Sequence, residues 1–262
     1  MAGETRPLNG KHAIVTGGGR GIGLGVATAL ARLGADVTIT GRDAGALQPE
    51  ADKLAADHKV KTAAQQLALS DPSGVKGAID RAMDRLGPAA ILVNNAGIAP
   101  SAKIQDTELE TWQDTFAVNA TGAFLCLQAV LPGMREAGWG RIVTIASTAG
   151  LRGYPRVAAY VASKHAVIGL TRAAALELAK TGITANAVCP GYTETEMAEG
   201  AIRNIMASGK TEAEARAVLA NNNPQGRLVQ VEEVADAVAW LCSPGASAVT
   251  GQAIAVAGGE VM

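Results

Sequence analysis

The sequence has little charge, few cysteines and few histidines, and each shortage disfavours a class of protein. Its 262 residues carry 23 basic and 24 acidic side chains, a net charge of -1, which indicates neither a basic nucleic-acid surface nor an acidic tail. The three cysteines lie far apart with no C-x-x-C pair, which argues against a disulfide framework or a zinc site. The three histidines are equally scattered and form no H-E-x-x-H motif, so no metal site is expected.

Long apolar segments are also missing from our reading of the sequence. We see no run of about 18 apolar residues that would cross a membrane, and the polar first residues contain no apolar signal-peptide core. The default expectation is a cytoplasmic protein with no membrane or nucleic-acid partner. With 48% hydrophobic residues the chain can bury a sizeable core, and we expect one domain over residues 1–262.

What the sequence does contain is a regular alternation of short apolar runs and helical patterns. Strands are expected at residues 12–16, 36–40, 62–69, 90–93, 141–145, 184–188 and 252–256. Helices are expected at residues 22–33, 44–57, 72–86, 107–136, 155–180 and 231–242. This alternation predicts βαβ units, and therefore an α/β fold with a parallel sheet covered on both faces. Residues 196–223 interrupt the pattern with two helix-prone pieces, which we interpret as a small helical lid.

Four glycine-rich or polar segments follow directly after predicted strands. They are residues 17–23, residues 94–97, Ser147, and Pro190 with Gly191. In a parallel α/β sheet, ligands bind beyond the carboxyl ends of the strands. We therefore expect these four segments to converge on one edge of the sheet.

The first of them, Thr16-Gly17-x-x-x-Gly21-x-Gly23, joins the first strand to the first helix. A loop in this place directs backbone N–H groups and the positive end of a helix dipole at an anion, and glycines let phosphates approach the backbone. The strict G-x-G-x-x-G spacing and the Lys-Ser/Thr of a P-loop are both missing. A flexible turn is the alternative, but the strand–loop–helix context favours a dinucleotide site.

The end of the second strand reads Thr40-Gly41-Arg42-Asp43. Glycine stands where an acid would bind the adenosine ribose 2′-hydroxyl, and the following arginine suits a 2′-phosphate instead. Arg20 in the glycine loop would add a second positive charge. NADP(H) is therefore favoured. Asp43 is either a helix cap or an acid that keeps NAD(H) as an alternative.

Tyr160 and Lys164 are four residues apart in a predicted helix, so they share one face. An isolated Tyr/Lys pair at this spacing is usually a half-buried ring beside a solvated charge. Ser147 precedes them at the end of a strand, and this company favours a catalytic interpretation.

The full series of motifs resembles the short-chain dehydrogenase/reductase family over nearly the whole chain and in the family's order. The matching motifs are Thr16-Gly-x-x-x-Gly-x-Gly23, Asn94-Asn-Ala-Gly97, Asn119, Ser147, Tyr160-x-x-x-Lys164 and Pro190-Gly191. The resemblance implies a single Rossmann-like domain with a doubly wound, seven-stranded parallel sheet. It also implies a nicotinamide cofactor and usually a homotetramer.

The resemblance also implies roles for four catalytic residues. Tyr160 would give a proton to the carbonyl oxygen as hydride arrives, and Ser147 would hold that oxygen. Lys164 would lower the pKa of Tyr160 and hydrogen-bond the nicotinamide ribose. Asn119 would support a water that relays protons to Lys164. Taken singly, Ser147 and Asn119 would be read as a strand-end hydroxyl and a locally bonded helix amide.

The same resemblance places the cofactor against residues from four segments. They are Thr16, Gly17, Gly19, Arg20, Gly21, Ile22, Gly23, Arg42, Asn95, Ala96, Gly97, Tyr160, Lys164, Pro190, Gly191, Thr193 and Thr195. One position departs from the family pattern. The family often has an Asp after the third strand, near the adenine, where this chain has Ala68 and where Asp71 comes too late.

The loop 150–156 and the lid are expected to cover the substrate. Candidate substrate residues are Ser147, Leu151, Tyr154, Tyr160, Tyr192 and Met197. Arg152 and Arg203 would either meet an anionic group or, as we favour, be solvated surface charges. Residues 162–171 and 182–191 resemble those of 3-oxoacyl-thioester reductases, 3-hydroxybutyrate dehydrogenases and polyketide ketoreductases. Gly138 and Thr181 replace the basic residues that carrier-protein reductases tend to have, which slightly favours a coenzyme A ester or a small free ketone.

The sequence thus predicts an NADP(H)-dependent oxidoreductase that interconverts a ketone and a secondary alcohol, with a 3-oxoacyl thioester as the first choice of substrate. An NAD-dependent dehydrogenase of a 3-hydroxy acid or secondary alcohol is the alternative. A non-catalytic, nucleotide-sensing regulator on the same fold is a third hypothesis. Alanines along residues 158–175 suggest a tetramer built partly on the Tyr/Lys helix.

Overall fold

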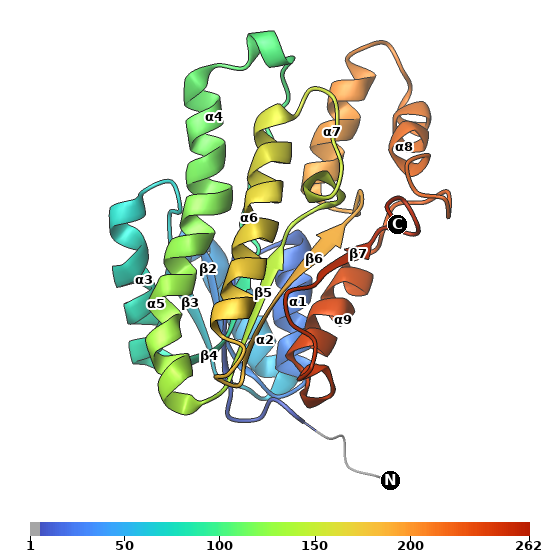
Figure 1. Ribbon diagram of the computed structural model, residues 1–262. Coiled ribbons are helices and arrows are strands. Elements are labelled where there is room, and N and C mark those ends of the chain that lie inside the picture. The colour runs from blue at the N-terminus through green and yellow to red at the C-terminus, as the bar shows by residue number, and fades with distance from the viewer. Residues whose placement is uncertain (1–5) are drawn as a thin grey trace.

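The computed structural model describes residues 6–262, and within them seven strands form one sheet (Figure 1). Every pair of neighbouring strands is parallel, and the order across the sheet is β3-β2-β1-β4-β5-β6-β7. The predicted parallel sheet is confirmed. The strands are β1 (His12–Thr16), β2 (Asp36–Gly41), β3 (Thr62–Gln66), β4 (Ala89–Asn94), β5 (Gly140–Ile145), β6 (Ile183–Pro190) and β7 (Ala253–Val256).

Helices cover both faces of the sheet, which makes the fold doubly wound (Figure 1). One face packs against α1 (Gly21–Arg32), α2 (Ala44–His58) and α9 (Val231–Cys242), whose apolar sides share a buried cluster with the strands. The other face packs against α3 (Pro72–Leu86), α5 (Gly122–Ala137) and α6 (Ala158–Glu177), which share a second cluster. These two cores are the apolar surface that the alternating sequence pattern places on either side of the strands.

The strand order reverses its direction between β1 and β4. The chain first builds outward through β2 and β3, then returns to the other side of β1 and builds outward through β4 to β7. The carboxyl ends of β1 and β4 therefore begin loops that diverge to opposite faces, which leaves a crevice for a ligand. The glycine-rich residues 17–23 and residues 94–97 enter this crevice.

Two element boundaries differ from the sequence-based expectation. The strand expected over residues 62–69 ends at Gln66, because residues 68–70 turn into Asp71, whose side chain caps α3. The helix expected to begin at Pro155 begins at Ala158, because Arg156 takes a left-handed backbone conformation (φ 67°) that no helix contains. The same helix ends at Glu177, three residues earlier than expected.

The helical region expected over residues 107–136 consists of α4 (Leu109–Phe116), a π-helical turn (Ala117–Thr121) and α5. These run without a break for 29 residues with a window of mean hydropathy 1.4, so by length and composition this helix is apolar enough to cross a membrane. The helix is thus more apolar than expected from the sequence, and the absence of a membrane partner stays a prediction. One third of that window is buried, and α5 packs against β4 and α3, so the same residues serve as a layer of the sandwich.

The insertion between β6 and α9 contains α7 (Glu196–Met206) and α8 (Glu212–Ala220), as the sequence predicts. Both helices lie beyond the carboxyl edge of the sheet (Figure 1). Ile202, Ala215, Leu219 and Leu228 form their own buried cluster, with Tyr192 packed against it. Short 3-10 helices occur at Ile104–Asp106, Thr148–Gly150 and Pro244–Ala246.

Candidate active site

Ser147 stands just beyond the end of β5, at the start of the turn Thr148–Gly150. Its backbone is extended, and its Oγ accepts a hydrogen bond from the Ala149 backbone N–H at 3.1 Å. A hydroxyl that accepts in this way keeps its own proton to donate. The β5 strand therefore presents one oriented hydroxyl at the carboxyl edge of the sheet.

Tyr160 and Lys164 lie on successive turns of α6, beside that hydroxyl. The Lys164 ammonium is buried and donates a hydrogen bond to the Ile145 carbonyl oxygen at 2.7 Å, and its Nζ lies 5.5 Å from the centre of the Tyr160 ring. Tyr160 also forms a hydrogen bond with Ser147. The structure thus brings together three of the four residues to which the resemblance gives catalytic roles.

The expectation that Lys164 makes Tyr160 acidic stays a prediction, and burial acts against it. Burial raises the pKa of Tyr160, and the hydrogen bond with Ser147 only partly opposes this effect. Burial also lowers the pKa of Lys164 to about 8, because water no longer stabilises the ammonium. The same desolvation acts on both groups, so the phenol stays protonated and is ready to give its proton away.

Asn119 lies in the π-helical turn, and its side chain is fully engaged with protein. Its Nδ2 donates to the Ile98 carbonyl oxygen at 2.9 Å and to the Ser163 hydroxyl at 3.0 Å, while its Oδ1 accepts from the Ile98 N–H at 2.8 Å. These contacts are not local in sequence. They fix the segment after β4 against α6, so the side-chain N–H groups have no spare donor for a relay water.

Gly97 marks how closely these groups approach one another. A Cβ at Gly97 would lie 3.2 Å from Asn119 Oδ1 and 3.6 Å from Lys164 Nζ. The glycine therefore keeps open the space beside the lysine.

The glycine loop has the features that a dinucleotide needs. Arg20 offers no side-chain cap to α1, and the first turn of this helix contains no acidic residue, so its N–H groups are open to an anion. Gly17 has a φ of 63°, and a Cβ at Gly23 would overlap the Gly17 carbonyl oxygen. The loop suits a bound pyrophosphate because its glycines leave the backbone N–H groups accessible and because α1 begins directly after it.

Thr16 and Asn95 hold this loop against the end of β4. Thr16 Oγ1 accepts from the N–H groups of Asn95 (2.9 Å) and Ala96 (3.1 Å), and Asn95 Nδ2 donates to the carbonyl oxygens of Thr16 (2.9 Å) and Gly17 (3.1 Å). The side chains of these two residues are therefore engaged with the protein backbone, and a bound cofactor would contact their backbone atoms. Ile22 packs into the core in the same way.

The residues expected to read the adenosine ribose separate into two groups. Arg42 is exposed beyond β2, while Asp43 caps α2 by accepting from the N–H groups of Gly45 (2.9 Å) and Ala46 (3.3 Å). Asp43 is therefore engaged as a cap. Arg20 forms an exposed ion pair with Glu196 at the start of α7, so its charge is directed at the lid in this structure.

The segment after β6 joins the cofactor crevice to the lid. The Gly191 N–H donates to the Val256 carbonyl oxygen, Thr193 Oγ1 donates to the Gly191 carbonyl oxygen, and Thr195 caps α7. A Cβ at Gly21 would lie 3.3 Å from Thr195 Cγ2. The residues expected on either side of the nicotinamide and its phosphates thus meet across the crevice, beside the end of β6 at Pro190.

Sequence reasoning missed Glu260, whose carboxylate is almost fully buried. Its Oε1 accepts from the Arg152 guanidinium at 2.8 Å and from the Tyr154 hydroxyl, and its Oε2 lies 2.8 Å from where a Gly191 Cβ would be. The favoured interpretation of Arg152 as a solvated charge is therefore wrong. The only signal in the sequence was a lone acid after Gly258-Gly259, and spacing gives no reason to pair it with residues 106 to 108 positions away.

The other substrate candidates have different surroundings. Leu151 packs against the buried Val167, Ile168 and Cys189 group, Tyr192 packs on the lid cluster, and Met197 is 52% exposed on α7. Arg203 is exposed, as expected. Within residues 6–262 no three histidine, cysteine or acidic side chains gather in a way that would hold a metal ion.

Comparison with known proteins identifies the family. The family model described as enoyl-(acyl carrier protein) reductase matches residues 17–260. A D-beta-hydroxybutyrate dehydrogenase of Rhizobium meliloti is 36% identical over 252 residues, which are 95% of this chain and 98% of that protein.

Two solved structures share the whole fold. An actinorhodin polyketide ketoreductase variant with NADPH has a TM-score of 0.90 and 39% identity, covering 95% of this chain and 97% of its own. A gluconate 5-dehydrogenase from Burkholderia cenocepacia with NADP and tartrate has a TM-score of 0.89 and 34% identity, covering 98% and 97%. The fold, the order of the motifs and these relatives agree, and the chain belongs to the short-chain dehydrogenase/reductase family of oxidoreductases.

Proposed function

We propose that this protein is an NADP(H)-dependent oxidoreductase that interconverts a ketone and a secondary alcohol. The observation that carries the proposal is the convergence of Ser147, Tyr160 and Lys164 beside the glycine loop. A hydroxyl and a phenol that both point at one place suit a single oxygen, which is the carbonyl oxygen of a ketone or the hydroxyl of its alcohol. We place the catalytic centre and the lid in one domain.

In the reducing direction, the bound nicotinamide supplies the hydride, and the protein supplies the proton. The Ser147 hydroxyl donates a hydrogen bond to the carbonyl oxygen and orients it. The Tyr160 phenol transfers its proton to the same oxygen. Lys164 then stabilises the resulting phenolate, because its buried Nζ lies over the Tyr160 ring and is held in place by the Ile145 carbonyl.

NADP(H) is the cofactor that the residues beyond β2 support. Arg42 is exposed there, and Asp43, the acid nearest to it in sequence, is used as a helix cap. A guanidinium suits a 2′-phosphate, whereas a 2′-hydroxyl is normally bound by a carboxylate. The two solved relatives, with NADPH and with NADP, are consistent with this assignment.

For the substrate, we propose a 3-oxoacyl thioester of the coenzyme A type or a similar small ketone. The candidate substrate loop contains two arginines: Glu260 neutralises Arg152 inside the fold, while Arg156 is exposed. A free 3-oxo acid would need an unpaired cation for its carboxylate, whereas a thioester or simple ketone carries no charge next to the reacting carbon. The neutralised Arg152 supports the ketoreductase hypothesis over a free-acid dehydrogenase that would bind its substrate through this arginine.

The test is a panel of uncharged and anionic ketones with NADPH and, separately, with NADH, followed by absorbance. We expect NADPH oxidation with acetoacetyl coenzyme A or ethyl acetoacetate and little turnover with acetoacetate. In Glu260→Gln the Arg152 charge is released, so kcat/KM for acetoacetate should rise relative to ethyl acetoacetate. A wild-type preference for acetoacetate with NADH would instead support the NAD-dependent alternative.

Two further outcomes distinguish the remaining hypotheses. Reduction of crotonyl coenzyme A would indicate that the substrate is an enoyl thioester, as the description of the family model suggests. Tight NADPH binding with no turnover of any ketone would support the nucleotide-sensing regulator.

We also propose that the protein is a homotetramer of the cytoplasm. The outward face of α6 carries Ala166, Gly169, Ala173 and Leu176, and α4 and α5 expose Trp112 and Phe124 nearby in the same layer. Small residues let helices approach closely, and large apolar side chains exposed beside them support a contact with another chain. The three cysteines are buried and unpaired, which is consistent with a reducing compartment.

A further inference from the structure

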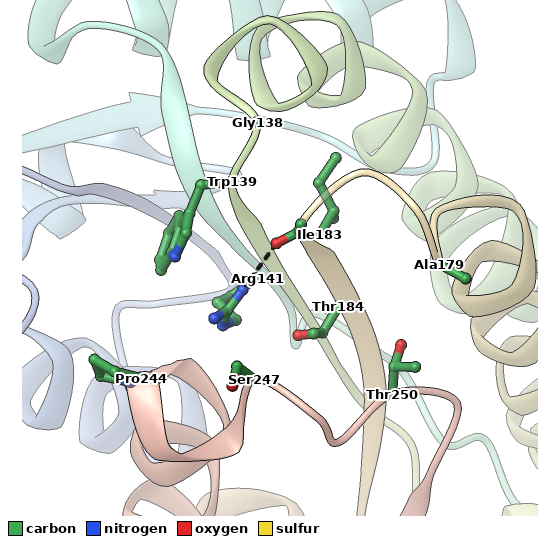
Figure 2. A pocket seen from close by; sticks show the side chains of 10 residues that line it. Gly138, Trp139, Arg141, Ala179, Ile183, Thr184, Pro244, Ser247 and Thr250 are labelled. Atoms are coloured by element: carbon green, nitrogen blue, oxygen red, sulfur yellow. Dashed lines mark hydrogen bonds between the residues drawn. The ribbon is translucent and has the colours of Figure 1, made fainter.

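A hollow at the amino-terminal edge of the sheet contains a buried cation that catalysis does not use. It measures about 470 Å³ and lies among the starts of β5 and β6, the end of α6 and the turn after α9 (Figure 2). Ser147 and Tyr160 lie at the opposite edge of the sheet, so this hollow is separate from the candidate active site.

The cation is Arg141, the second residue of β5. It is only 3% exposed, and its Nη1 donates to the carbonyl oxygens of Gly140 (2.8 Å) and Gly182 (3.2 Å). Its Nε is buried and has no hydrogen-bond partner. Among residues 6–262 no carboxylate lies within ion-pair distance of it. Burial lowers the pKa of this guanidinium because the charged form loses water.

A buried cation without a counter-charge is costly, so its surroundings indicate what would offset it. The Thr184 hydroxyl points toward the guanidinium, and Ser247 lines the same hollow across from it (Figure 2). The Trp139 ring stacks on Arg141 at 4.5 Å, and the Lys11 ammonium lies 4.4 Å from the same ring. Within the described part of the chain, the lining of the hollow therefore combines one cation with hydroxyl groups and contains no acid, and a second cation lies against its Trp139 ring.

We propose that this hollow binds a small oxyanion, a phosphate or a carboxylate, through the Arg141 guanidinium and the Thr184 and Ser247 hydroxyls. The Nη2 group of Arg141, which no carbonyl engages, donates to such an anion, and the hydroxyls supply further donors. The Trp139 ring fixes the plane of the guanidinium and keeps water from one of its sides. The site is independent of the reaction at the other edge of the sheet.

The probe is inorganic phosphate, added to protein saturated with NADP so that the phosphate positions of the glycine loop are filled. Ionic strength is held constant with chloride. We expect the wild type to melt about 3 °C higher at ten times the Kd, and calorimetry to count one phosphate per chain. Arg141→Gln, which keeps donors for the two carbonyl groups, should lose this shift. The exposed control Arg81→Gln should retain it.

Thr184→Val with Ser247→Ala is the second variant, and it carries the test if Arg141→Gln does not fold. It removes two hydroxyls and no charge, so it should weaken phosphate binding several-fold. An equal rise in melting temperature in all variants, or no rise in the wild type, would overturn the proposal. A third result would also overturn the proposal: Arg141→Gln has a lower molar mass in light scattering than the wild type, and phosphate has no effect on the wild type. The Arg141 guanidinium would then be paired with a carboxylate of a second copy. The same melting experiment with sodium acetate in place of phosphate distinguishes a carboxylate ligand from a phosphate ligand, because the preferred anion gives the larger shift.

Discussion

Tyr160 and Lys164 differ from the sequence-based account in one respect that affects how the reaction is read. Desolvation raises the pKa of Tyr160 and lowers the pKa of Lys164 to about 8, so it opposes the charged form of each group. The identity and order of the residues were readable from the sequence. Their protonation was not, because desolvation depends on what the fold packs around them. The pairing of Glu260 with Arg152 was not predicted because the two residues are 108 positions apart and only the fold brings them together.

The most direct test at this scale is Tyr160→Phe. The phenol proton is lost while the ring and its packing remain, so we expect kcat to fall by about 10²- to 10⁴-fold. NADPH affinity, measured by fluorescence, should change little. Retention of wild-type turnover would show that another group donates the proton.

His12 gives a prediction about stability and pH. Its ring is buried, with Nδ1 donating to the Gly87 carbonyl oxygen at 2.7 Å and Nε2 accepting from the Thr38 hydroxyl at 2.8 Å. Burial lowers the pKa of His12 below its usual 6.5. Between those two pKa values the unfolded chain binds more protons than the folded protein, so stability falls as pH drops below 6.5.

The loss from this one group is at most about 1.4 kcal/mol per pH unit. In His12→Gln the side chain does not titrate. Urea unfolding between pH 7 and 5 should therefore give a flatter profile for the variant than for the wild type. Parallel profiles would show that His12 does not contribute to acid sensitivity.

At the scale of elements, the alternation of strands and helices was predictable because each has its own apolar period. The ends were less so. Asp71 stops β3 early by capping the next helix, and the left-handed Arg156 delays α6. The π-helical turn at Ala117–Thr121 was not predictable from the apolar pattern. A single extra residue in one helical turn needs no particular amino acid and shifts the spacing of the apolar residues only slightly.

The glycine loop and its helix give a paired test. In Gly23→Ala the new methyl group would overlap the Gly17 carbonyl oxygen. Because that oxygen belongs to the backbone, the glycine loop itself would have to move. We expect a lower melting temperature and at least a tenfold loss of NADPH affinity. Gly77→Ala is the control, because it lies inside α3 and its methyl group meets only the end of the Arg81 side chain at 3.4 Å. That variant should gain about 0.5–1 kcal/mol in stability.

At the scale of the whole molecule, the sequence predicted a parallel sheet with its loops at one edge, and the structure confirms that arrangement. The order of the strands and the packing of α9 beside α1 depend on contacts between distant residues, so only the structure shows them. The helix over residues 107–136 was expected, but its high mean hydropathy was not recognised, because its hydrophobic residues are interspersed with small and polar ones.

Assembly is the prediction that belongs to this scale. Ala173→Arg places a long charged side chain on the outward face of α6 and should convert a tetramer into smaller species, measured by light scattering. Ala56→Arg on the exposed side of α2 is the matched control and should leave the mass unchanged. A wild-type mass of one chain would contradict the proposed tetramer.

The π-helical turn has a consequence for how chain length can vary in this protein. Deleting one residue there would restore regular helical spacing, and everything after it would rotate by about 100°. If the residues after the deletion keep their places, Asn119 loses its hydrogen bond to the Ile98 carbonyl oxygen. If Asn119 keeps its place, Cys126 and Val130 rotate out of the core. Conservative exchanges of side chains should be tolerated at Val118, whereas a single-codon loss between Ala117 and Thr121 should not.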